Sequence, residues 1–461
     1  MPVTLVDPTS TTSWARRLVV LLFIGLLVAL PAAWITSQYM GNEVNSVLSY
    51  AAGDGWCEAG VYPGMGKHCF GDYASAGLVA QHDFGLGGYN FAKGPYNADP
   101  LSAYNSLYPP VSQFPHVATD VLRLGGVSPR FTFDIYIGLL ILAVLVPAIW
   151  VAWVWRGSAF AVAPLLIIGV AALPAIAAVD RGNSAGFVVP LLLLFAVFLG
   201  REPPWAAPAA AAAAALVRPQ FILITVALLA IGRWRQALAA VGAFVFVTFA
   251  SFAVVPGGFV PAMRAWVDNV TSFRGGFGDV RLPTPANISF ARTFASIGQW
   301  LQHGPGIIHD FGGHLTGWAY YTPLQCGVAV LAVALLVLIP LRRHVPRSVA
   351  LVVAFVIAAM LPGVVPAYYL AFALVIAACV LADHLLDGAP WFWGWPLLVA
   401  TVLSIAPIPL ARDTAPGSPL SRNSILLEEV GKVWLAVVVV ALAWVIVRAW
   451  RSRHEIADGL E

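Results

Sequence analysis

Long apolar runs recur along the chain and constrain its fold more than any other feature. A helix needs about 20 predominantly apolar residues to cross the hydrocarbon core of a bilayer. Apolar runs fall near 18–36, 131–155, 158–179, 184–199, 205–217, 220–231, 236–255, 324–341, 348–365, 367–386, 392–410 and 430–449. Only 10% of the residues are charged, against about 25% in a soluble domain. We therefore predict an all-α, polytopic transmembrane protein with about twelve transmembrane segments and exclude a water-soluble globule.

Arginine-rich connections predict the orientation of these segments, because short cytoplasmic loops carry an excess of Lys and Arg. Such residues fall on alternate connections: Arg156, Arg201, Arg233 with Arg235, Arg342 with Arg343 and Arg347, and Arg448 with Arg451 and Arg453. Both termini are then cytoplasmic. The predicted order is a cytoplasmic N-terminus (1–17), a first transmembrane helix (18–36), an extracytoplasmic loop (37–130), transmembrane helices with short or broken segments (131–255), a second extracytoplasmic loop (256–323), C-terminal transmembrane helices (324–449) and a cytoplasmic tail (450–461).

Three consecutive apolar runs, 184–199, 205–217 and 220–231, are too short to cross comfortably at 1.5 Å per residue. They favour broken or half-depth helices, which occur at membrane depth only where the backbone is buried in protein or lines a water-filled cavity. We expect an outer cavity floored by residues 217–219. The alternative is a single kinked helical hairpin over 205–231.

Arg218 lies within the membrane under either interpretation. A charge at that depth is costly, so by default it has a function and an anionic partner. A structural ion pair with Asp180 or Asp134 is the competing interpretation.

Among the acids of the first predicted outer loop, Asp72 is the best defined. The stretch 72–80 can start a helix with this carboxylate in its first turn, where the helix dipole holds an acid in place. Further along, Tyr-Pro-Pro at 108–110 predicts a rigid helix start before the amphipathic stretch 111–124.

The cysteine and histidine patterns define no firm disulfide or metal site. Cys57 and Cys69 lie in the same outer loop, where they either form a disulfide closing a small loop or remain free thiols. No H-E-x-x-H motif and no Cys/His pair at zinc spacing occurs. No cofactor is firmly implied, and a divalent cation bridging Asp72 and a phosphate stays an open alternative. The net charge of +3, without a long basic run, gives no sign of a nucleic-acid partner.

Several short motifs in order give the chain a resemblance to a known group. They are Asp72-Tyr73, Tyr96-Asn97 before Tyr108-Pro109-Pro110, Arg181-Gly182-Asn183, Arg218-Pro219, and Asn287-Ile288-Ser289 with Arg292. This pattern resembles the GT-C membrane glycosyltransferases, in particular the actinobacterial polyprenyl-phosphate-sugar-dependent mannosyl- and arabinofuranosyltransferases of glycosyltransferase family 87. Two positions depart from it, since Arg218 stands where the family usually shows Lys and Asn183 where Gln is commoner.

The resemblance implies a sugar donor carried on polyprenyl phosphate, a glycolipid or glycan acceptor, and a lipid bilayer around the enzyme. Such transfer needs a general base near the acceptor hydroxyl and cations near the leaving phosphate. Asp72, or Glu43 as second choice, is then the base, and a single displacement inverts the anomeric centre.

The remaining candidate roles follow from the same resemblance. Arg218, Arg292 and Arg181 are candidates to bind the donor phosphate, although interfacial arginines also snorkel without a function. Tyr73, Tyr108, Asn183, Asn287 and Tyr320 are candidates to position substrate. Interface belts also account for many tyrosines such as Tyr320.

Two other function classes compete with this one. A multi-pass transporter or flippase of lipid-linked precursors would also use broken helices and an intramembrane arginine, but inverted repeats, its usual signature, are not evident. A scaffold subunit of an envelope-synthesis complex would depend on no single carboxylate.

Overall fold

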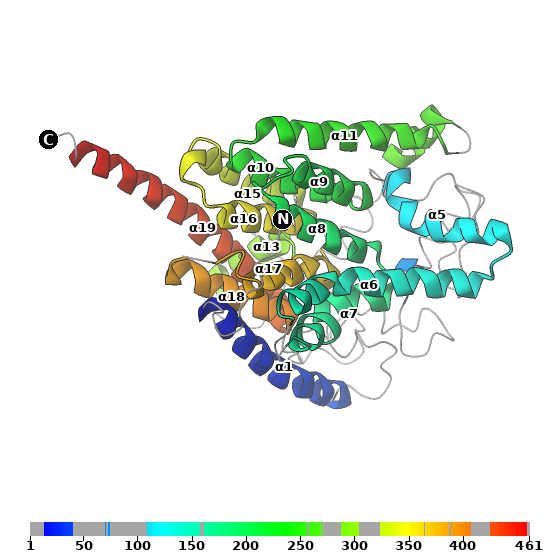
Figure 1. Ribbon diagram of the computed structural model, residues 1–461, viewed down its shortest axis with the longest axis horizontal. Helices are drawn as coiled ribbons and strands as arrows, with labels where there is room; N and C mark the ends of the chain where they lie inside the picture. The colour runs from blue at the N-terminus through cyan, green and yellow to red at the C-terminus, as the bar shows by residue number, and fades with distance from the viewer. Residues whose placement is uncertain are drawn as a thin grey trace.

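Helices are the only regular elements in the described part of the chain, which confirms the all-α prediction for those residues. The computed structural model (Figure 1) describes residues 13–39, 70, 72–73, 108–156, 161–255, 258–268, 270, 287–303, 323–363, 365–386, 389–406 and 425–458. The predicted residues Glu43, Cys57, Cys69 and Tyr320 lie outside these ranges.

The elements follow one another as a series of short and long helices. The first group is α1 (Ser13–Tyr39), η2 (Pro110–Gln113), α5 (Phe114–Asp120), η3 (Val121–Gly125), α6 (Pro129–Val154), η4 (Leu165–Val170), α7 (Leu173–Arg181), η5 (Ser184–Phe187), α8 (Val188–Phe198) and α9 (Ala206–Val217). The second is η6 (Pro219–Ile224), α10 (Thr225–Ala230), α11 (Trp234–Phe252), α13 (Phe290–His303), α15 (Pro323–Leu338), η7 (Arg342–His344), α16 (Arg347–Met360), η8 (Ala367–Ala371), α17 (Phe372–Leu381), α18 (Trp391–Ile405) and α19 (Ile425–Asp458).

Four of these helices are long and apolar enough to cross a membrane. Their apolar spans are Trp14–Ala32, Arg130–Val154, Trp234–Phe252 and Glu429–Ser452. Seven further apolar helices are shorter, including Ala206–Val217 and Pro219–Ala230. The predicted total of about twelve spans is therefore not confirmed, whereas the prediction of short apolar helices after residue 184 is.

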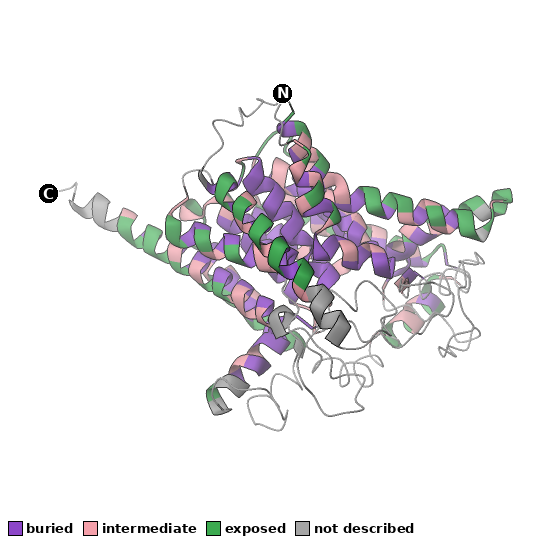
Figure 2. Cartoon of the chain, turned by 90° about the horizontal axis from the view of Figure 1, so that it is seen from below, coloured by how far each residue is buried: buried purple, intermediate pink, exposed green. Residues whose placement is uncertain are grey.

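The centre of the bundle is formed by helices that are apolar all round. All described side chains from Val349 to Met360 in α16 and all those of α17 are buried, which is the pattern of helices enclosed by other helices. Peripheral helices instead present apolar side chains outward, among them Phe23 and Leu27 of α1 and Phe246 of α11. Figure 2 shows this contrast between a buried centre and exposed outer faces. Exposed apolar faces of this kind suit a lipid environment.

Arginine-rich turns from distant parts of the chain meet at one end of the bundle. Gly200 lies against the side chain of Arg347, and Gly232 lies against that of Arg342. In α19, Ser452 Oγ lies 3.4 Å from His344 Nδ1. We call this the arginine-rich end.

Polar turns gather at the other end. Ser112 Oγ donates to the Leu216 carbonyl at 2.9 Å, and the Val111 N–H donates to Ser251 Oγ at 3.3 Å. These bonds hold the η2 segment against the ends of α9 and α11, and Figure 1 shows α5 beside these ends. We call this the polar end.

The predicted break at Arg218 is present. α9 ends at Val217, Arg218 has an extended backbone (φ −141°, ψ 104°), and Pro219 opens η6. Proline cannot donate to the preceding turn and disfavours a helical residue before it, so the helix stops here.

The apolar run 158–179 differs from the single segment that the sequence predicts. It divides into the π-helical turn η4 and the helix α7, which are separated at Ala171 and Ala172. Pro174 stands at the start of α7, after the extended Ala172, and a proline at that position terminates a preceding helix and begins a new one.

Close helix packing at Gly327 gives a stability prediction. A Cβ at Gly327 in α15 would lie 2.5 Å from the Leu361 carbonyl oxygen, a backbone atom that cannot move aside as a side-chain tip could. Overpacking costs typically about 1–3 kcal/mol, so Gly327→Ala should lower the unfolding temperature of the detergent-purified protein. Gly242 in α11 has open space around the same position, and Gly242→Ala should leave that temperature unchanged or raise it. Equal shifts for the two variants would contradict this account of the packing.

Candidate active site

The turn after α7 requires glycine at position 182 for two reasons, its backbone conformation and the close approach of Tyr73. Gly182 is left-handed (φ 63°), which costs other residues about 1–2 kcal/mol. Its N–H donates to the Val179 carbonyl at 2.9 Å, and the Asn183 N–H donates to the Ala178 carbonyl at 2.8 Å, as at many helix C-termini. A Cβ at Gly182 would lie 2.6 Å from the Cβ of Tyr73. Glycine therefore allows Tyr73 to pack directly on the turn.

The segment containing Asp72 is fixed on this turn from both sides. The Phe70 N–H donates to the Asp180 carbonyl at 2.7 Å. Tyr73 is buried in an aromatic cluster with Tyr136 of α6, and Tyr136 Oη donates to the Gly182 carbonyl at 3.0 Å. Asp72 and Tyr73 have helical backbone geometry, while the rest of the predicted helix 72–80 lies outside the described residues.

Asp72 accepts three hydrogen bonds from this turn. Arg181 donates through Nε to Oδ2 at 2.7 Å and through Nη2 to Oδ1 at 2.9 Å, and Asn183 Nδ2 donates to Oδ2 at 2.7 Å. A two-point pair of this kind fixes both position and orientation. The Arg181 side chain is 6% exposed and that of Asp72 is 26% exposed. Because a carboxylate offers about four lone-pair positions, Asp72 keeps capacity on Oδ1 for one more donor.

Asn183 connects Asp72 to Arg218. Its Oδ1 accepts from Arg218 Nη2 and from the Ala185 N–H, while its Nδ2 donates to Asp72. Two donors on the oxygen and one acceptor on the nitrogen are compatible with a single orientation of the amide. Asn183 thus sets the position of Arg218 relative to Asp72.

Arg218 is buried without a carboxylate of its own. It is 6% exposed, and in the described part of the chain its side-chain hydrogen bond goes to the neutral amide of Asn183. Its Nε has no hydrogen-bond partner among the residues that the structure describes. Neither Asp180 nor Asp134 forms an ion pair with it in that part of the chain. The predicted structural pair is therefore not what holds Arg218.

Three tyrosines surround the two guanidinium groups. Arg218 lies over the ring of Tyr108 at 4.5 Å from its centroid, and Arg181 lies over Tyr368 at 5.8 Å. The hydroxyls of Tyr108 and Tyr369 are 3.2 Å apart. Cation–π contacts of this kind favour a buried guanidinium and leave its N–H groups available for other partners.

The pKa of Asp72 is lowered overall. Burial alone would raise it, but the charge of Arg181, the hydrogen bonds from Arg181 and Asn183, and the charge of Arg218 together outweigh burial. Asp72 is therefore an ionised carboxylate at neutral pH. Asp72, Arg181 and Arg218 then combine one negative charge with two positive ones, so this network favours an additional anion.

Asn287 and Arg292 belong to a neighbouring arrangement. Asn287 Nδ2 donates to the Gly363 carbonyl at 2.9 Å, and Asn287 Oδ1 accepts from the Val365 N–H at 2.9 Å. These bonds hold the turn that leads into Tyr368. Arg292 is buried at the start of α13, and among the described contacts none joins it to Asp72, Arg181 or Arg218.

Sequence patterns did not single out His116, Tyr136, Tyr368 or Tyr369. Tyr368 and Tyr369 stand inside a long apolar stretch, where tyrosine is easily taken as core or interface. The Pro-Gly pair at 362–363 and Pro366 before them signal the break that places these rings at the polar end.

For metal binding, no group of three or more His, Cys, Asp or Glu side chains comes together among the described residues. The oxygens of Asp72 accept from the Arg181 guanidinium and the Asn183 amide.

Fold and site together define a multi-pass helical membrane protein whose polar end holds a fixed carboxylate between two buried guanidinium groups. Comparison with protein families gives a match to glycosyltransferase family 87 over residues 107–366, more than half of the chain. The chain belongs to this family and is a glycosyltransferase, as its motifs indicate. Comparisons with curated proteins and with solved structures find no match. Arg181, Asn183 and Arg218 fall within the matched range, and Asp72 precedes it.

Loss of the Asn183 amide should change the pH dependence of sugar transfer. Without the hydrogen bond from Nδ2, the ionised form of Asp72 is less stabilised and its pKa rises. The acidic limb of kcat/KM in Asn183→Ala should therefore move to higher pH, by roughly one unit for one charged hydrogen bond.

Ser184→Ala is the matched control, because Ser184 is the next buried residue and makes no described side-chain bond to Asp72. Its acidic limb should coincide with that of the wild type. An unshifted limb in Asn183→Ala would show that Asp72 does not set it.

Proposed function

We propose that this chain is an inverting glycosyltransferase that moves a sugar from a polyprenyl-phosphate donor to a hydroxyl of a cell-envelope glycolipid or polysaccharide. Mannose or arabinofuranose is the sugar that the family resemblance suggests, in an actinobacterial setting. The reaction takes place on the extracytoplasmic face of a bacterial plasma membrane.

The observation that carries this proposal is the buried Arg218, whose guanidinium has no carboxylate bonded to it among the described residues. Burying a cation is costly unless it is paired, and Asp72 is already bound at two points by Arg181. An anionic group entering the polar end supplies the missing partner. The phosphate of a lipid-linked donor fits, because its lipid tail lies in the bilayer and its phosphate is multiply hydrogen-bonding.

The same geometry supports the acid–base chemistry. Asp72 is ionised, fixed by Arg181 and Asn183, and has one lone-pair position left to accept the proton of an acceptor hydroxyl. Arg218 stabilises the negative charge that grows on the leaving phosphate. Retention would need a second carboxylate about 5 Å from the first, and the described hydrogen-bond network contains Asp72 alone.

Orientation follows from the distribution of arginines. If the arginine-rich end is cytoplasmic, both termini are cytoplasmic and Asp72 faces the opposite side. Arg292 and Arg181 remain candidates to contact the donor phosphate. Tyr73, Tyr108, Asn183 and Asn287 remain candidates to position substrate, with Tyr320 outside the described residues.

Substitution of each candidate carboxylate tests whether Asp72 or Glu43 is the general base. Asp72→Asn should lower kcat by about 10²–10⁴-fold, the usual contribution of a general base, whereas Glu43→Gln should stay close to the wild type. Transfer from labelled polyprenyl-phosphate mannose or arabinofuranose by purified protein measures both. Wild-type rates in both variants would refute the base assignment, and an inactive wild type over the donor panel would refute the enzyme proposal in favour of transport.

The role of Arg218 is tested by donor saturation. Arg218→Ala should raise the donor KM by about 10- to 100-fold, because a charged hydrogen bond contributes about 1.5–3 kcal/mol. Arg218→Lys, which keeps the charge, should lie in between. Arg235→Ala changes an exposed arginine near the other end of the bundle and should leave KM unchanged. A donor KM unaffected in Arg218→Ala would count against phosphate binding.

A further inference from the structure

His116 of α5 lies inside the aromatic cluster that supports Asp72. Its ring is stacked on Tyr136 with centroids 4.6 Å apart, and it lies 5.6 Å from the ring of Tyr73. The side chain is 3% exposed. His116 therefore contacts the aromatic residue next to the proposed base and the tyrosine that bonds the Gly182 turn.

Within the residues that the structure describes, neither ring nitrogen of His116 has a hydrogen-bond partner. The pKa of His116 is lowered to about 3, first by burial and then by the charge of Arg218, against the opposing charge of Asp72. The ring is consequently a neutral imidazole near neutral pH, with one N–H donor and one lone-pair acceptor.

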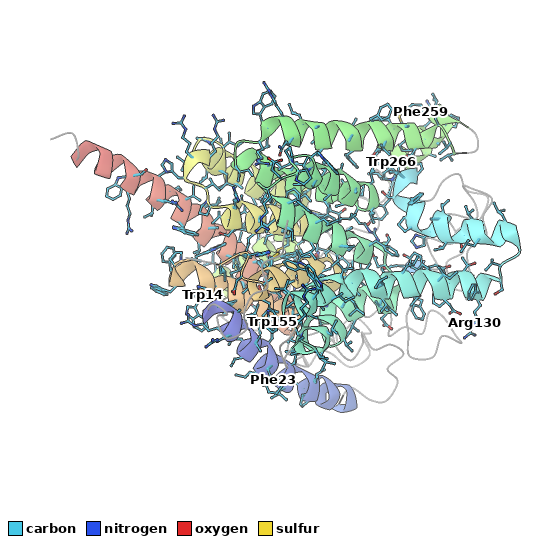
Figure 3. The ribbon with its side chains drawn as sticks, in the orientation of Figure 1. Trp14, Phe23, Arg130, Trp155, Phe259 and Trp266 are labelled. Atoms are coloured by element: carbon cyan, nitrogen blue, oxygen red, sulfur yellow. The ribbon has the colours of Figure 1, made fainter. Side chains whose placement is uncertain are left out.

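Two unpartnered polar atoms are an unusual feature of a buried side chain. Leaving one buried donor or acceptor unsatisfied costs about 1–3 kcal/mol, and such groups call for an explanation in function or in a bound partner. Ring stacking alone does not supply one, because phenylalanine would make the same stack without this cost. Figure 3 shows α5 above the start of α6, the helix that carries Tyr136, near the labelled Arg130.

We propose that His116 binds hydroxyl groups of a sugar substrate next to Asp72, donating from one ring nitrogen and accepting at the other. This inference rests on the sugar transfer proposed above and adds a residue that selects the substrate.

The chemistry of the ring favours hydroxyls over other ligands. A phosphate diester offers acceptors only and would leave the imidazole lone pair unsatisfied, whereas an ammonium group offers donors only. A hydroxyl donates and accepts, so sugar hydroxyls satisfy both nitrogens. The donor sugar and the acceptor sugar share this chemistry.

The test compares substrates that lack single hydroxyls. In His116→Phe the ring and its stacking on Tyr136 remain while both nitrogens are lost. With wild type and variant, kcat/KM is measured for the intact substrates, for monodeoxy analogues of the donor sugar and for monodeoxy analogues of the acceptor. For intact substrates, His116→Phe should be about 10- to 100-fold slower. For a monodeoxy analogue that lacks a hydroxyl bound by one of the His116 nitrogens, the ratio of wild-type to variant kcat/KM should be smaller than for the intact substrates, because one of the two hydrogen bonds is already absent.

The series in which this smaller ratio appears identifies the donor or the acceptor as the ligand. His384→Phe is the matched control, because His384 also contacts an aromatic ring, that of Trp150 at 5.3 Å, in a different part of the bundle. It should leave every ratio unchanged. A His116→Phe variant that slows all analogues by the same factor, or none, overturns the proposal. A wild type that transfers no sugar instead overturns the proposed function.

Discussion

The ion pair between Asp72 and Arg181 is the interaction on which the arrangement of the site depends. It joins a polar segment near residue 72 to a helix end more than a hundred residues later, at two points and with little exposure of the arginine. Breaking a buried pair by removing one member costs about 3–5 kcal/mol, because the other charge is left alone. The pair therefore engages Arg181 with Asp72, and among the described residues it leaves Arg218 hydrogen-bonded to the neutral amide of Asn183.

The fold gives Arg218 this position by interrupting a helix at depth. α9 is only twelve residues long, and the extended backbone at Arg218 ends it where the polar turns meet. Such a break is acceptable because surrounding protein groups satisfy the freed backbone: the Arg218 N–H still donates to the Ala214 carbonyl, and the Leu216 carbonyl accepts from Ser112. The same break in the helix thus accounts both for the short length of α9 and for the buried position of Arg218.

The short helices and the break at Arg218 can be predicted from the sequence because helix length, proline and charge are local signals. The runs around 205–231 are too short to cross a bilayer comfortably, and Pro219 follows Arg218. Partners could not be predicted in the same way. The contact between Arg181 and Asp72 is not among the predictions, because which side chain meets which carboxylate depends on how α7 packs against a segment far away in the chain. His116 and Tyr368 were missed since the same residues commonly occur as buried or interfacial packing, and only their neighbours give them meaning.

Phe70, Asp72 and Tyr73 are held on the Gly182 turn by contacts with the helices. The Phe70–Asp180 bond, the packed Tyr73 and the Asp72–Arg181 pair all lie after residue 69, so the described contacts of the carboxylate segment are made with the helices. Loop-closure entropy grows only slowly with length. Changes in the number of residues before position 70 therefore cost little free energy of loop closure, and these described contacts of Asp72 and Tyr73 with the helices do not depend on that number.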